Sequence, residues 1–114
     1  MPSKANPLKL NALQLRTLTI LQELAQDPSH ALPPEPSGAV AITNLPHPHG
    51  DHFHVGHFLV SSRDASGLYN EQVWKALERK GLARAAFPQV IALTPQGLVY
   101  ETGIRGEILH GGDH

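Results

Sequence analysis

Residues 70–100, the stretch that decides the fold, read NEQVWKALERKGLARAAFPQVIALTPQGLVY. In the first third of this stretch, apolar side chains recur at the spacing of a helix face. They are Val73, Trp74 and Leu77. Residues 71–80 are therefore predicted to form a helix, and Gly81 follows at the position where a helix often ends in the left-handed conformation.

The last third of the same stretch has the pattern of a β-hairpin. Residues 90–93 and 98–100 are two apolar runs, and the turn sequence Thr94-Pro95-Gln96-Gly97 separates them. Proline presets φ at its turn position, and glycine permits the left-handed residue of a bulge. The predicted order along the chain is thus a helix followed by a C-terminal β-hairpin.

The segments ALERKGL and LTPQG within this stretch resemble the recognition helix and the wing of winged helix-turn-helix domains. In that family the helix lies in the DNA major groove and the wing touches phosphates. The resemblance implies a small winged-helix-like α+β domain that contacts DNA through outward side chains, which here are Gln72, Lys75, Arg79 and Arg84. Glu71 and Glu78 share the exposed helix surface, and many domains of this architecture bind protein, so a DNA partner and a protein partner both remain open.

The first half of the chain is predicted to begin with an amphipathic helix over residues 11–25. Asn11 is placed to cap its start, and the Asp27-Pro28 pair stops it, because the residue before a proline is pushed out of the α region. Residues 28–38 contain four prolines and are expected to form a connector. Short strands are expected to follow over residues 40–43 and 53–60.

Five of the eight histidines lie between His47 and His57. Neutral imidazole is a common ligand of zinc and nickel, and a carboxylate can complete such a site. Two histidines at i and i+2 project from one face of a strand and can hold the same ion. The sequence therefore predicts a site for a divalent transition metal, zinc or nickel, with ligands drawn from His47, His49, Asp51, His52 and His54. The alternative interpretation is an exposed turn that carries histidine only as a polar residue.

The string His47-x-His49-x-Asp51-His52 resembles the metal-binding signature of the metallo-β-lactamase hydrolases. In that family the signature holds two zinc ions and a nucleophilic hydroxide, so the resemblance implies a metal-dependent hydrolase. The family also needs a longer αββα sandwich with a further His, Asp and His downstream. Here the Gly-rich tail 103–114 holds residues of those types, namely His110, Asp113 and His114. Hydrolysis is therefore the alternative to a non-enzymatic binding or regulatory domain.

The composition limits the kinds of partner. Nine Lys and Arg residues oppose ten Asp and Glu residues, so the formal net charge of −1 creates no global field toward nucleic acid or an anionic membrane. The chain has no cysteine, which excludes thiolate metal sites. No membrane span or secretion signal is recognisable, and we expect residues 1–114 to form a single cytoplasmic domain that does not bind a membrane.

Overall fold

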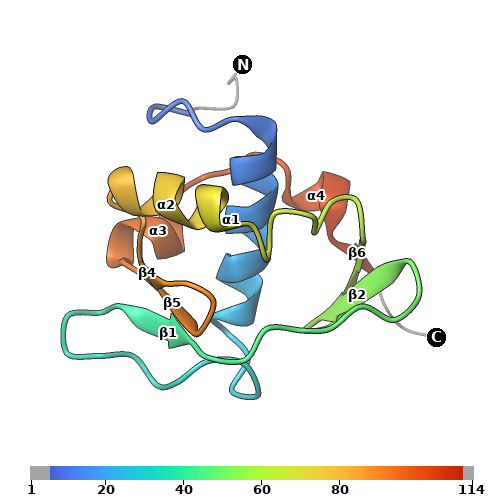
Figure 1. The fold of residues 1–114 in the computed structure, drawn as a ribbon, viewed down its shortest axis with the longest axis horizontal. Helices are drawn as coiled ribbons and strands as arrows, with labels where there is room; N and C mark the ends of the chain where they lie inside the picture. Colours follow the sequence, from blue (N-terminus) through green and yellow to red (C-terminus); the bar gives the residue numbers. More distant parts are fainter. Residues whose placement is uncertain (1–5, 112–114) are drawn as a thin grey trace.

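Helix α1 (Ala12–Leu24) runs through the centre of the molecule in the computed structural model, which describes residues 6–111 (Figure 1). Asn11 caps it as predicted. The Asn11 side chain accepts a hydrogen bond from the backbone N–H of Gln14 at 2.8 Å, and the Gln14 side chain accepts one from the backbone N–H of Asn11 at 3.0 Å. This reciprocal pair is a capping box. The fully enclosed apolar residues of the helix are Leu18, Ile20, Leu21 and Leu24.

Two small antiparallel sheets lie on either side of α1 (Figure 1). The first sheet has the strand order β1-β5-β4 and consists of β1 (Val40–Ile42), β4 (Ala83–Ala86) and β5 (Val90–Leu93). The second has the order β2-β3-β6 and consists of β2 (His52–Val55), β3 (Phe58–Ser61) and β6 (His110–Gly111). The hydrophobic core is continuous between them, and the prediction of an α+β fold is confirmed.

Helix α2 (Glu71–Arg79) confirms the helix predicted in the deciding stretch. It begins at Asn70, whose side chain accepts hydrogen bonds from the second and third backbone N–H groups of the helix, and Gly81 follows it at a φ of +77°. The indole of Trp74 donates to the carbonyl of Leu68 at 2.9 Å and packs edge-on against Phe87, with the ring centroids 4.8 Å apart. This aromatic pair fixes α2 on the β4–β5 hairpin.

The prediction of one strand over residues 53–60 is wrong. The chain turns at Gly56-His57, and Val55 pairs with Phe58 to close a tight hairpin between β2 and β3. Gly56 has a φ of +61°, which glycine adopts at the first position of a two-residue hairpin turn. The alternation of apolar residues continues on both sides of this turn, so the pattern alone does not reveal it.

The predicted pairing of residues 90–93 with 98–100 is also wrong. Strand β5 pairs with β4, and the chain then enters helix α3 (Pro95–Val99). The Thr94 side chain accepts a hydrogen bond from the backbone N–H of Gly97 at 3.1 Å, and proline occupies the first turn, where no backbone N–H is needed. A hairpin does follow α2, but β4 and β5 form it, instead of residues 90–93 and 98–100.

The expected Gly-rich tail, residues 103–114, contains ordered elements. Helix α4 (Arg105–Ile108) packs with Ile108 and Leu109 buried, and β6 then pairs with β3 in the register Leu59 with His110. Residues 112–114 lie outside the described part of the chain. Within residues 6–111, no helix has the length and apolar character needed to span a membrane.

Candidate functional site

The histidine cluster is built around the start of strand β2. His49 and His52 form an isolated antiparallel bridge, in which the backbone N–H of His49 donates to the carbonyl of His52 at 2.7 Å. Gly50, at a φ of +68°, allows the chain to reverse between them. The segment before the cluster is anchored by the hydroxyl of Tyr69, which donates to the carbonyl of Pro46 at 3.0 Å. Burial raises the pKa of Tyr69, which keeps this donor protonated.

Strand geometry places His52 and His54 on the outer face of the second sheet. The residues between and after them, Phe53 and Val55, are buried, while His54 is exposed and His52 is partly exposed. This alternation is the one expected for a strand with one face in the core. The predicted shared face of His52 and His54 is thus confirmed, although the strand is shorter than predicted.

Three imidazole rings of the cluster lie next to one another. The ring centroids are 4.8 Å apart for His49 and His54, 5.0 Å for His52 and His54, and 6.3 Å for His49 and His52. The first two pairs meet edge to face, with interplanar angles of 86° and 73°. Within residues 6–111, however, no three His, Asp or Glu side chains are already arranged around one possible metal position.

The other two predicted ligands lie differently. Asp51 is fully exposed, and its Oδ1 atom is 3.4 Å from Nδ1 of His52, so it lies beside one ring and not among the three. His47 is exposed before β2 and takes part in none of the three ring contacts. The cluster therefore consists of His49, His52 and His54, with Asp51 at its edge.

The side chains predicted to contact DNA lie on α2 and β4. All four residues are exposed. Nζ of Lys75 is 3.6 Å from Oε2 of Glu71, and Nη2 of Arg84 is 2.9 Å from Oε1 of Glu35. These acidic neighbours offset the positive charge that a phosphate backbone would require. Contact with DNA through Gln72, Lys75, Arg79 and Arg84 stays a prediction.

The hydrolase alternative also stays a prediction. His110 lies on β6, two strands away from the cluster, and is exposed. Asp113 and His114 lie outside the described residues. No family model, no curated protein and no solved structure matches this chain.

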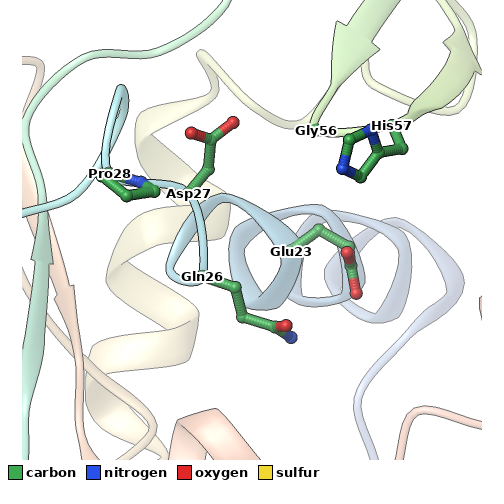
Figure 2. Close-up of a pocket in the computed structure, with 6 residues that line it drawn as sticks. All are labelled: Glu23, Gln26, Asp27, Pro28, Gly56 and His57. Carbon is green, nitrogen blue, oxygen red and sulfur yellow. The ribbon is translucent and has the colours of Figure 1, made fainter.

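A second candidate site, which the sequence reasoning missed, lies at the C-terminal end of α1. Figure 2 shows the hollow there, with Asp27 at the end of the helix and His57 on the β2–β3 turn. It has a volume of about 380 Å³ and is lined by Glu23, Gln26, Asp27, Pro28, Gly56 and His57. Hydrogen bonds from the backbone N–H and the hydroxyl of Ser29 hold the pKa of Asp27 below its usual value. One feature of the sequence could have indicated this site: the acidic residues Glu23 and Asp27 lie at the end of the helix predicted over residues 11–25.

Proposed function

We propose that this protein is a non-enzymatic binding domain that holds one divalent transition-metal ion, zinc or nickel, through His49, His52 and His54. The observation that carries the proposal is the spacing of the three rings, with centroids 4.8, 5.0 and 6.3 Å apart. When several imidazoles bind one ion tetrahedrally, the distance between their ring centroids is fixed, and this required distance can be compared with the three observed ones.

A zinc–nitrogen bond of about 2.1 Å places each ring centroid about 3.2 Å from the ion. Two such centroids at a tetrahedral angle are then about 5 Å apart. The two pairs that include His54 already have this spacing. The remaining pair, His49 and His52, must close by about 1 Å. His49 is exposed, so a change in its side-chain torsions can supply this movement without disturbing the core.

Asp51 has the position of a partner that orients a metal ligand. A ligating histidine commonly donates its second ring nitrogen to a carboxylate, which fixes the tautomer and strengthens the ligand. Nδ1 of His52 faces Oδ1 of Asp51, so Nε2 is the nitrogen left for a metal. Three protein ligands would leave a fourth position for water or for a group on a partner. Hydrolysis by such a water is the alternative function.

The test is calorimetric titration of the protein with zinc and with nickel. We expect a dissociation constant in the micromolar range or tighter for the wild type, and a loss of far more than tenfold in the double variant His52→Ala/His54→Ala, because two of three ligands are removed. Lowering the pH from about 7.5 to about 5.5 should also weaken binding, because ligating imidazoles must be neutral and protons compete with the metal for the same ring nitrogens. The matched control is His57→Ala, which removes an exposed histidine outside the three rings.

Equal, weak binding by the wild type and by the double variant would rule out this proposal. In the Asp51→Ala variant, we expect affinity to fall about 10- to 100-fold, the range found for partners of metal ligands. An unchanged affinity in this variant would remove Asp51 from the site but leave the three histidines.

A further inference from the structure

Two hollows adjoin at the C-terminal end of α1. The first is the polar hollow of Figure 2, between the helix end and the β2–β3 turn. The second, of about 410 Å³, lies between the helix end and the proline-rich connector. They share three lining residues: Gln26, Asp27 and Pro28. The two hollows therefore lie side by side along these residues, and we call the pair the α1-end groove.

The second hollow is suited to an apolar group. Most of its lining is apolar: Ala25, Pro28, Ala31, Leu32, Pro33 and Pro34. Leu32 is 53% exposed, so an apolar group that covered it would remove apolar surface from water. The connector is held in place here, because the backbone N–H of Leu32 donates to the carbonyl of Ala41 at 2.9 Å and that of Ala31 donates to the carbonyl of Asp27 at 3.0 Å. The apolar hollow is thus part of the fold before any partner arrives.

The first hollow is suited to a cation. The C-terminal end of a helix carries a partial negative charge, and cationic side chains usually occupy the last turn. Helix α1 has no basic residue in its last turn and instead presents Glu23 and Asp27. Glu23 is paired with Arg105, and Asp27 binds Ser29 only through Oδ1. The hydrogen bonds from Ser29 favour the ionised form of Asp27, so this carboxylate and the negative helix end would together attract an external cation.

We infer that the α1-end groove docks a segment of a partner protein in which a large aliphatic side chain lies next to an arginine. The aliphatic group would occupy the hollow beside Leu32 and Pro34. The guanidinium would occupy the hollow between Asp27 and His57. This inference does not depend on the metal site.

The experiment is an NMR titration of the 114-residue chain labelled with ¹⁵N. The probe is the capped dipeptide N-acetyl-leucyl-arginine amide. One control probe replaces arginine with citrulline, which has nearly the same shape but no charge, and the other replaces leucine with alanine. We expect shifts of the backbone signals of residues 23–34 and 56–57 with a dissociation constant in the millimolar range or tighter. Each control probe should bind about three- to fivefold more weakly, the range of one partly exposed ion pair or one small apolar contact.

Two substitutions test the two halves of the groove separately. Asp27→Asn should remove the preference for arginine over citrulline, and Leu32→Ser should remove the preference for leucine over alanine. Glu101→Gln, at an exposed acidic position outside the groove, should change neither preference. Both substituted side chains are at least partly exposed, so the variants should fold, and their spectra will show whether they do. Equal binding of the arginine and citrulline probes, or no shifts at about 10 mM probe, would overturn the inference.

Discussion

Ser29 lowers the pKa of Asp27 through two hydrogen bonds. Its backbone N–H and its hydroxyl both donate to Oδ1 of Asp27, at 2.9 and 2.8 Å, and these bonds stabilise the carboxylate relative to the carboxylic acid. The positive charge available from His30 and His57 acts in the same direction. Because the pKa of Asp27 is lowered in the folded state, the ionised group stabilises the fold above the unfolded pKa. That contribution disappears as the pH falls through the folded pKa.

The substitution Ser29→Ala should move the pKa of Asp27 up toward its usual value, but not all the way, because the backbone donor remains. The variant should therefore lose more stability relative to wild type at pH 7 than at an acidic pH below the folded pKa, where the carboxyl group is protonated in both proteins. Carbon-detected NMR titration of the Asp27 carboxyl group, with urea unfolding at both pH values, measures this. Ser66→Ala, at an exposed serine, is the control. An unchanged pKa of Asp27 would contradict the assignment.

At the scale of residues, the side-chain positions that depend on local periodicity could be predicted from the sequence. His52 and His54 were placed on one face because strand side chains alternate, and this holds wherever the strand ends. The position of His49 against them depends on a chain reversal at Gly50, which periodicity does not describe. The place of Asp51 beside His52, instead of among the ligands, is set by the same reversal. The predicted ligand set was for this reason larger than the group of three rings in the structure.

At the scale of elements, the segment that begins at Thr94 was predicted to be a hairpin turn but forms the start of helix α3. The sequence Thr-Pro-Gln-Gly suits a hairpin turn and also suits a helix start, because threonine caps helices and proline is favoured in their first turn. The outcome depends on β5, which has partners on both sides, β1 and β4, and so has no free edge for a third strand. Sheet order is a property of distant segments, so the local sequence could not distinguish the two outcomes. Helices α1 and α2 were predicted correctly because their caps and apolar faces are local signals.

Gly97 in α3 provides a test of this helix. A Cβ atom at this position would lie 2.0 Å from the carbonyl oxygen of Leu82, so Gly97→Ala must displace backbone. We expect a loss of about 1–3 kcal/mol in the free energy of unfolding, as for other overpacked sites. Gly106→Ala in α4 is the matched control, because nothing lies within 4 Å of the position that its new methyl group would occupy. Urea unfolding followed by the fluorescence of Trp74 compares the two variants, and equal stabilities would contradict the packing of α3.

At the scale of the whole molecule, polar contacts inside the core join the first helix to the last third of the chain. The amide of Gln22 donates to the carbonyls of Gly97 and Tyr100 at 2.9 and 2.8 Å. The hydroxyls of Thr19 and Thr102 are 2.7 Å apart and buried. The residues that these contacts join are 75 to 83 positions apart in the sequence. The amphipathic pattern of residues 11–25 did not predict that its polar residues would be buried as well.

Replacing Gln22 with leucine should leave the carbonyl groups of Gly97 and Tyr100 without the side-chain amide that donates to them. We expect the free energy of unfolding to fall by about 1–3 kcal/mol, the cost of leaving buried polar groups unpaired. Gln26→Leu, four residues further along the same chain segment and exposed, should change stability by less than about 0.5 kcal/mol. Chemical denaturation of the two variants gives the comparison. Similar losses in both would mean that the Gln22 contacts do not hold the C-terminal third in place.

The pairing of β6 with β3 has a consequence for the order in which the protein matures during synthesis. The three histidines belong to residues 49–54, and the ribosome makes them well before residues 110–111, which supply the third strand of their sheet. Until then the β2–β3 hairpin is a two-stranded ribbon, which is only marginally stable in water. A nascent chain would therefore present its histidines on a marginally stable hairpin, and full affinity for the proposed ion would be acquired only after residues 110–111 have joined the sheet.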